Sequence, residues 1–181
     1  GSLTQLKVWD IYDPDGQLEE RTIPPKQLQG LTPTWGARDA NWFFDFPASA
    51  AKIIHFLETS KIYREGLISF DGAIAVNVSV LKTLIELTGP IELLDYGLTI
   101  NPGNFLAEIQ KEVEAGKDKA AGEPKRILKV LTPILLERLG NFGDAERRAL
   151  IQALKDHFEK KDIMAFFKDL VLESYAKGLG V

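Results

Sequence analysis

The segment FDGAIAVNVSVLKTLIELTGPI, residues 70–91, decides the fold of this chain. Its first part, residues 70–76, is short and nearly all small or branched, which is typical of a strand covered on both faces in an α/β sheet. Apolar residues then recur at helical spacing over residues 80–87. Gly89 and Pro90 end that helix, because glycine suits the C-cap and proline cannot continue the helix. The segment therefore predicts a core strand followed by a helix.

The densest polar cluster of the chain lies upstream of this segment. It comprises Arg38, Asp39, Asn41 and Asp45. An arginine offers a planar fork for a phosphate group, while aspartate and asparagine can hold a divalent ion that bridges the phosphate. The same residue types are also typical of an arginine–aspartate pair that braces a loop under a helix N-terminus. The residues alone leave both interpretations open and favour the second.

The N-terminal part predicts a hairpin followed by a helix. Residues 3–12 alternate in the manner of a strand, and residues 13–16, Asp-Pro-Asp-Gly, carry turn chemistry. Residues 17–23 predict a return strand that stops at two prolines, so we expect this hairpin at a sheet edge. A helix then runs from Pro47 to about residue 60, with Asp45 or Phe46 near its cap.

The remainder of the chain is mostly helical in pattern. Residues 91–94 predict a strand, and Asn101-Pro102 starts a helix that ends near residue 115. From residue 124 the pattern is purely helical, and Asp162 is expected to cap the last helix. We therefore predict a single α/β domain over residues 1–181. It would have a small mixed sheet flanked by helices and a helical C-terminal part over residues 124–178.

The composition of the chain limits the classes of function that it can have. The chain has 181 residues, 45% hydrophobic and 27% charged, which is typical of a globular protein with a proper core. A net charge of −4 argues against a nucleic-acid-binding face but leaves room for a small anion site. There is no cysteine, so disulfides and cysteine zinc sites are excluded. No run of eighteen apolar residues occurs, so we expect no membrane segment in this chain.

Three early carboxylates suggest a cation site. Asp10, Asp13 and Asp15 lie in a glycine-containing loop, and clustered carboxylates suit hard cations. Their spacing does not fit a twelve-residue calcium loop, which would begin at Ile11 and end at Thr22, where no carboxylate is available. The spacing therefore favours a plain turn.

Other candidate side chains are scattered. Lys125 and Arg126 form a basic pair at a helix start and would add positive charge to an anionic pocket, although a solvated face is the more common role. His55 and His157 lie far apart without ligand spacing, so the sequence predicts no metal or general-base role for them.

Five motifs in order carry a family resemblance. They are DIYDPDGQL (10–18), RDANW (38–42), DFPASA (45–50), DGAIAV (71–76) and LTGPI (87–91). In this order they resemble a bacterial family catalogued only as domain of unknown function four thousand and twelve, over about residues 1–180. The resemblance implies a surface protein with a membrane helix and a further strand region before these residues. The leading Gly1-Ser2 is typical of a cleaved expression tag, so we expect a fragment of a longer protein.

The order of these elements along the chain in turn resembles, more distantly, that of the LytR-CpsA-Psr phosphotransferases. Those enzymes attach glycopolymers from lipid pyrophosphate carriers to peptidoglycan. The common features are a polar segment entering a helix, a buried strand, a second helix, a glycine turn and a later arginine-bearing helix. By this resemblance, Arg38 and Asp39 are the catalytic candidates and face a pyrophosphate with its magnesium ion. Asn41, Lys125 and Arg126 would contact the ligand.

Two functional hypotheses follow from these resemblances. The first is an extracytoplasmic cell-envelope domain, membrane-anchored at the cell surface in the full-length protein. It would bind or transfer a phosphorylated glycan or lipid-linked precursor, with a polyprenyl-phosphate-linked glycan or cell-wall polymer as partner. Asp10, Asp13 and Asp15 would then be metal ligands. The alternative is a non-catalytic surface scaffold or interaction module, because the early Pro-Arg-Asp motif of those enzymes is replaced here by residues 13–15, Asp-Pro-Asp.

Overall fold

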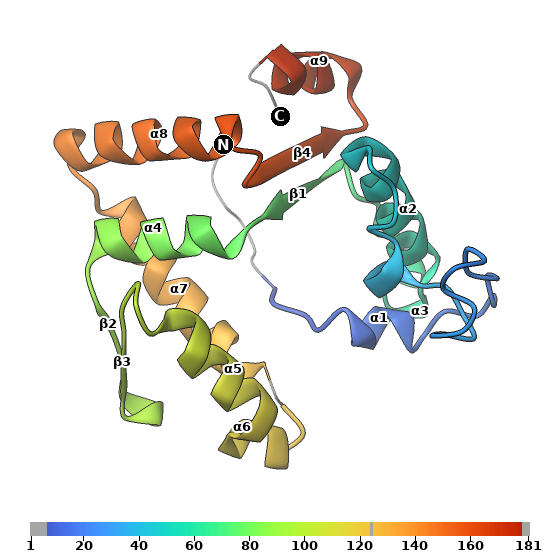
Figure 1. Cartoon of the computed structure of the whole chain (residues 1–181), viewed down its shortest axis with the longest axis horizontal. Coiled ribbons are helices and arrows are strands. Elements are labelled where there is room, and N and C mark those ends of the chain that lie inside the picture. The colour runs from blue at the N-terminus through green and yellow to red at the C-terminus, as the bar shows by residue number, and fades with distance from the viewer. Residues whose placement is uncertain (1–6, 124, 179–181) are drawn as a thin grey trace. The chain divides into compact units, whose positions relative to one another are not determined.

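The computed structural model describes residues 7–123 and 125–178. The fold is mixed α/β, as predicted, and is 55% helical with small two-stranded sheets. The chain divides into two compact units (Figure 1). Unit 1 is built mainly from Val76–Ile163, and unit 2 from Trp9–Ala75 together with the chain from Met164 onward. The single domain predicted over residues 1–181 stays a prediction.

Unit 1 consists of helices around a short hairpin. Its elements are α4 (Val78–Thr88), β2 (Ile91–Leu93), η2 (Leu94–Tyr96), β3 (Leu98–Ile100), α5 (Phe105–Ala115), α6 (Lys117–Ala120), α7 (Arg126–Gly140) and α8 (Asp144–Glu159). Buried side chains from α4, the hairpin, α5 and α7 form one hydrophobic core: Ile85, Ile91, Leu93, Ile100, Phe105, Ile109, Ile127, Leu131 and Leu135. Apolar burial of this kind is the main stabilising term of such a unit.

The helix predicted over residues 80–87 is confirmed as α4, and the strand predicted over residues 91–94 is confirmed as β2 except for Leu94, which begins η2. Asn77 caps α4 by accepting a hydrogen bond from the backbone of Ser79, and Gly89 follows the helix with a φ of 78°. The guanidinium of Arg138 on α7 then donates to the carbonyl groups of residues 88–90, which satisfies acceptors left open at the helix end. Strands β2 and β3 pair antiparallel, and their alternation buries Ile91 opposite Ile100.

Unit 2 is organised around the long helix α2. Its elements are α1 (Tyr12–Asp15), η1 (Ala37–Asp39), α2 (Phe46–Thr59), α3 (Lys61–Arg64), β1 (Gly72–Val76), β4 (Ile163–Phe167) and α9 (Leu170–Gly178). The last residue of β1 and the first residue of β4 belong to unit 1. A small core of Trp35, Ala37, Ala40 and Phe56 joins η1 to α2. Helix α2 begins as predicted, because the Asp45 side chain accepts a hydrogen bond from the backbone of Ala48.

The predicted N-terminal hairpin is wrong over its described residues. Residues 12–15 form the helix α1 in place of a turn, and residues 3–6 lie outside the described part. The chain after α1 does not pair back on the residues before it. Leu18 bridges to Ser60 and Thr22 bridges to Trp35. Local turn chemistry was therefore overridden by pairing with more distant segments.

The helix predicted to follow Asp162 is also wrong at its start. Residues 163–167 form β4, which pairs with β1. Hydrogen bonds from Asn77 N to Asp162 O and from Lys168 N to Asp71 O flank this pair. The segment Ile-Met-Ala-Phe-Phe is rich in branched and aromatic residues, which suits a strand. The described strands thus form two separate sheets instead of the one mixed sheet predicted, and Ile74 of β1 is 61% exposed instead of covered.

A buried histidine joins α4 to α8 within unit 1. His157 lies with its Nδ1 2.8 Å from Asp162 Oδ2 and its Nε2 2.9 Å from Thr83 Oγ1. The hydrogen bond from His157 holds the pKa of Asp162 below its ordinary value. Since both ring nitrogens have partners, the buried imidazole is satisfied without a ligand.

This arrangement predicts an acid-dependent loss of stability. A carboxyl group with a lowered pKa in the folded state adds stability above its unfolded pKa, and this stability is lost as the pH falls through the folded pKa. Replacing Asp162 with Asn should therefore destabilise the protein at neutral pH, and the difference from the unmodified protein should shrink below about pH 4. Urea unfolding at a series of pH values measures this, with Asp156→Asn on α8 as the control. A difference that does not change between pH 7 and pH 2 would contradict the assignment.

Candidate functional site

The predicted Arg38 cluster forms around the short helix η1 of unit 2. Trp35, just before η1, packs its ring on Phe56 of α2 with 5.5 Å between centroids. Its Nε1 donates to the carbonyl oxygen of Asp39 over 3.1 Å. Tryptophan burial and this hydrogen bond together fix η1 against α2, so the backbone that carries Arg38 is held at both ends.

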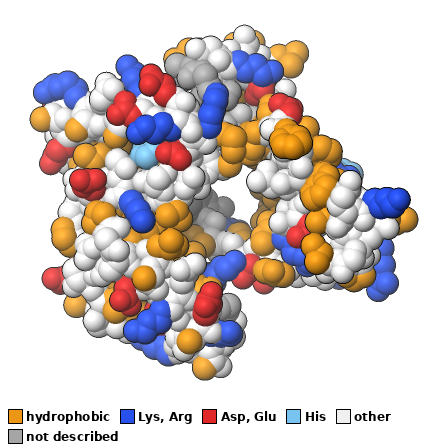
Figure 2. Space-filling model, in the orientation of Figure 1, with side chains coloured by type: hydrophobic (Ala, Val, Ile, Leu, Met, Phe, Trp, Pro, Cys, Tyr) orange, Lys and Arg blue, Asp and Glu red, His pale blue; other side chains and the backbone are white. Residues whose placement is uncertain are grey.

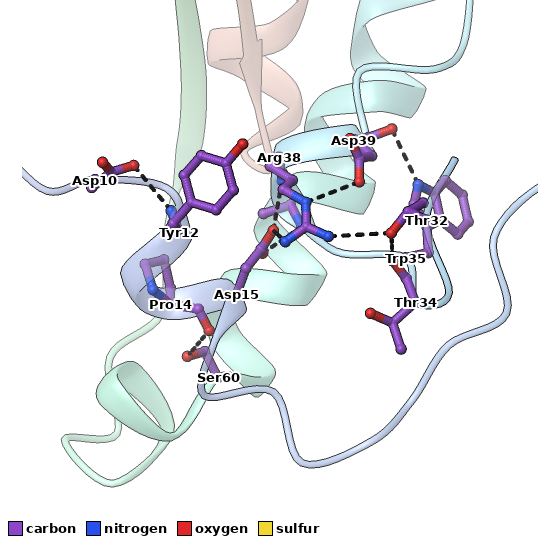
Figure 3. Close-up of polar contacts among 11 residues, drawn as sticks. Asp10, Tyr12, Pro14, Asp15, Thr32, Thr34, Trp35, Arg38, Asp39 and Ser60 are labelled. Atoms are coloured by element: carbon purple, nitrogen blue, oxygen red, sulfur yellow. Dashed lines mark hydrogen bonds and ion pairs between the residues drawn. The ribbon is translucent and has the colours of Figure 1, made fainter. Parts of the chain in front are cut away.

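Asp15 is the centre of the cluster (Figure 3). Its side chain is 3% exposed, and its two oxygens accept hydrogen bonds from the backbone N–H groups of Ala37 and Arg38 over 2.7 and 3.1 Å. A Cβ at Gly36 would lie 2.6 Å from an Asp15 oxygen, so a larger residue here would displace the carboxylate. The Asp15 carboxylate on α1 thus caps the N-terminus of η1. The spacing of these residues in the sequence did not indicate this contact.

The guanidinium of Arg38 is held by neighbours on several sides. Its Nε donates to Asp39 Oδ2 over 3.1 Å, and its Nη2 donates to Thr32 Oγ1 over 3.2 Å. Its Nη1 lies 4.0 Å from Asp15 Oδ2, and its Cζ lies 5.4 Å from the centre of the Tyr12 ring. The predicted Arg38–Asp39 pair therefore exists, and it braces the loop as the second interpretation of the sequence proposed.

A cavity of about 250 Å³ lies beside this cluster. Two arginines and two acidic residues are among the residues that line it: Asp15, Leu18, Glu20, Arg21, Pro33, Thr34, Trp35, Gly36 and Arg38. Arg21 is the functional candidate that the sequence did not reveal. It lies in a segment predicted as a solvent-facing strand, and the pairing of Thr22 with Trp35 brings that segment next to η1. Asp39 and Asn41 do not line this cavity.

The predicted metal ligands are not brought together. Asp15 is engaged by the two backbone N–H groups, and Asp10 accepts a hydrogen bond from the backbone of Tyr12 over 3.1 Å. Asp13 is exposed on α1. Among residues 7–123 and 125–178, no group of three acidic or histidine side chains is arranged to hold a metal ion.

Lys125 and Arg126 belong to unit 1, at the start of α7, whereas Arg38 belongs to unit 2. Arg126 forms ion pairs with Asp118 at 3.5 Å and with Asp95 at 3.6 Å. Asp118 is buried and also accepts a hydrogen bond from the Tyr96 hydroxyl. Burial and this hydrogen bond raise the pKa of Tyr96 to about 12. Arg126 therefore already neutralises acidic groups of its own unit.

The comparison with protein families concerns the part of the chain that holds the Arg38 cluster. The model of the family described as "Protein of unknown function (DUF4012)" matches residues 7–113. The chain belongs to the DUF4012 family. The DUF4012 match includes the described chain of unit 2 up to Ala75 and extends into α5, and it is shorter than the resemblance predicted over about residues 1–180. Arg21 and Arg38 lie inside it, whereas Lys125 and Arg126 lie outside.

Comparison with curated proteins and with solved structures finds no match in either set. Within the described residues of this DUF4012 chain, no helix has both the length and the apolar character to cross a membrane.

Removing the Asp15 carboxylate tests the structure of the cluster. The variant Asp15→Ala should lose about 1–3 kcal/mol of unfolding free energy, because two N–H groups are left without their acceptor. The variant Asp15→Asn keeps one acceptor oxygen and should lose less. Urea denaturation measures both, and Asp13→Ala, an exposed change on the same helix, should stay within about 0.5 kcal/mol of the unmodified protein. Equal effects of Asp15→Ala and Asp13→Ala would show that the carboxylate does not hold η1.

Proposed function

We propose that this chain is an extracytoplasmic domain of the bacterial cell envelope, distantly similar to the LytR-CpsA-Psr phosphotransferases. In this proposal it binds a phosphorylated glycan or lipid-linked precursor, such as a polyprenyl-phosphate-linked glycan, and the full-length protein is membrane-anchored. The observation that carries the proposal is the convergence of Arg21 and Arg38 on one cavity beside η1. The layout of the chain, with a polar segment entering a helix, then a strand and a second helix, is the further support for this proposal.

The size and the arginines of the cavity suit a single phosphate group better than a complete glycan or lipid-linked ligand. A volume of about 250 Å³ lies just below the 300–1,000 Å³ usual for small-molecule pockets. It therefore takes a compact anionic group while the rest of the ligand stays outside. Guanidinium groups bind phosphate oxygens through paired N–H donors. Arg38 lines the cavity, and its Nη1 lies 4.0 Å from Asp15 Oδ2, which is too long for a hydrogen bond and leaves N–H donors for a phosphate oxygen.

The described residues offer little to hold the magnesium ion that the resemblance implies. Asp15 gives its oxygens to two backbone N–H groups, which leaves Glu20 as the other carboxylate of the cavity. Protein-bound magnesium usually takes one or two carboxylates and completes its octahedron with waters and phosphate oxygens, so an ion here would be held mainly by the phosphate group. In this proposal the arginines bind the phosphate group, and Asp39 positions the Arg38 side chain through its 3.1 Å contact.

A scaffold without ligand binding is the second candidate. The observation in its favour is that Arg38 is engaged by Asp39 and Thr32, as expected of a structural brace. The charges of the lining residues also balance, with two arginines, Arg21 and Arg38, and two acidic residues, Asp15 and Glu20. A bound phosphate would then gain little from the site, because the carboxylates oppose it.

Arg21 separates these two functions experimentally, because it lines the cavity without taking part in the hydrogen bonds around Asp15. Inorganic pyrophosphate at a hundred times its dissociation constant should add roughly 2.7 kcal/mol of stability, seen as a rise of several degrees in Tm. The variant Arg21→Ala should keep the unliganded Tm and lose this rise. The variant Arg148→Ala, an exposed arginine on α8, should keep it. No rise in the unmodified protein, with or without magnesium, would favour the scaffold.

A further inference from the structure

The residues that line the cavity beside η1 carry balanced charges before any ligand enters. Arg21 and Arg38 are the basic residues, and Asp15 and Glu20 are the acidic ones. Acidic and basic side chains are also interspersed on the surface that Figure 2 shows. A ligand with only negative charge would meet the two arginines but would also be opposed by the two carboxylates. The balance therefore bears on the charge pattern of the ligand itself.

The four charged residues differ in how far they are already engaged. Asp15 accepts hydrogen bonds from two backbone N–H groups, and its side chain is 3% exposed. Arg38 is paired with Asp39 over 3.1 Å, as Figure 3 shows. Among the described residues, no hydrogen bond or ion pair holds the side chain of Glu20 or that of Arg21. The cavity therefore offers an open cation at Arg21 and an open anion at Glu20.

Two other basic side chains of unit 2 lie near these residues, and neither forms an ion pair with Glu20 within the described part of the chain. Glu20 also lines a smaller cavity of about 120 Å³ together with Arg64. The guanidinium of Arg64 is bound by Glu19 through two hydrogen bonds of 2.7 Å. Lys52 lies over the ring of Trp35, 4.9 Å from its centre, and does not line either cavity. A ligand that covers Glu20 without a cation of its own would leave this carboxylate unpaired, which is costly.

We infer that the cavity beside η1 binds a zwitterionic phosphate group, in which a phosphomonoester is joined through a short carbon chain to a protonated primary amine. This inference rests on the phosphate-binding function proposed above and names the ligand class within it. The phosphate group lies against Arg21 and Arg38, whose guanidinium groups supply paired N–H donors. The ammonium group donates to the Glu20 carboxylate, which then keeps a partner when the ligand covers it. A cavity of about 250 Å³ holds these two small groups and leaves the remainder of the ligand outside.

The phosphomonoester follows from the charges on the two sides. Its dianion matches Arg21 and Arg38, whereas a phosphodiester, as in a lipid headgroup, has a single negative charge. A phosphorylated glycan that carries an amine-bearing phosphate therefore fits the cavity better than a lipid-linked phosphate. The rival partner for Glu20 is a magnesium ion that bridges it to the phosphate. The ammonium group is favoured because it needs one acceptor, whereas magnesium needs six oxygen ligands.

Isothermal titration calorimetry with O-phosphoethanolamine and ethyl phosphate tests this inference, because the two compounds differ by the ammonium group. At pH 8 and low salt, the unmodified chain should bind O-phosphoethanolamine roughly fivefold more tightly, which is the upper range for an exposed ion pair. The variant Glu20→Gln should lose this preference and bind ethyl phosphate at least as tightly as the unmodified chain does. The matched control Glu65→Gln, which lies outside the cavity and faces Lys61 at 3.8 Å, should keep the preference.

Two further titrations separate the rival ligands. Glycerophosphoethanolamine has the phosphodiester of a lipid headgroup and should bind more weakly than O-phosphoethanolamine. Equal or tighter binding of the diester would overturn the assignment of a phosphomonoester and indicate a lipid headgroup. Magnesium should not tighten the binding of ethyl phosphate. A magnesium effect that is lost in Glu20→Gln would overturn the inference, because Glu20 would then hold a metal ion.

Failure of this inference is distinguishable from failure of the proposed function. Equal binding of O-phosphoethanolamine and ethyl phosphate by the unmodified chain would overturn the ammonium contact alone. Pyrophosphate binding that is lost in Arg21→Ala would still support a phosphate site in that case. If neither ester nor pyrophosphate binds to the unmodified chain, the inference and the proposed function are both contradicted.

Discussion

The buried carboxylate of Asp15 is the constraint on which the rest of unit 2 depends. It joins α1 to η1 through the N–H groups of Ala37 and Arg38, across more than twenty residues of sequence. A buried carboxylate is costly unless it is fully hydrogen-bonded, and these two donors meet that requirement. The packing of Trp35 on Phe56 then holds η1 on α2. The walls of the cavity next to Gly36 and Arg38 follow from the position of η1.

Arg38 has a structural role in this arrangement, and the phosphate-binding role proposed for it is compatible with that one. Its contacts with Asp39 and Thr32 fix the direction of the side chain, which is a structural role. A guanidinium fixed in advance also loses less entropy when it meets a phosphate group. The acidic residues Asp15 and Glu20 balance the charge of the two arginines at the site. The arrangement therefore suits recognition of a phosphate group better than the strong charge stabilisation that phosphoryl transfer needs.

The sequence predicted those parts of the fold that depend on local signals. Helix α4 was found from its apolar spacing and from Gly89, and α2 was found from its cap at Asp45. Elements that depend on distant pairing were missed. The apolar residues of β4 fit a helix as well as a strand, and pairing with β1 decides between them. Arg21 could not be found for the same reason, because no local pattern links it to Arg38.

Amide hydrogen exchange of Ala37 and Arg38, followed by nuclear magnetic resonance, tests the central role of Asp15 most directly. The amide groups at the start of a short helix are normally open to solvent and exchange fast. Because both donate to a carboxylate that is 3% exposed, we expect them to exchange more slowly than the amide groups of other short turns in the chain. Exchange as fast as that of an unprotected loop would contradict the account, because η1 would then not be held by Asp15.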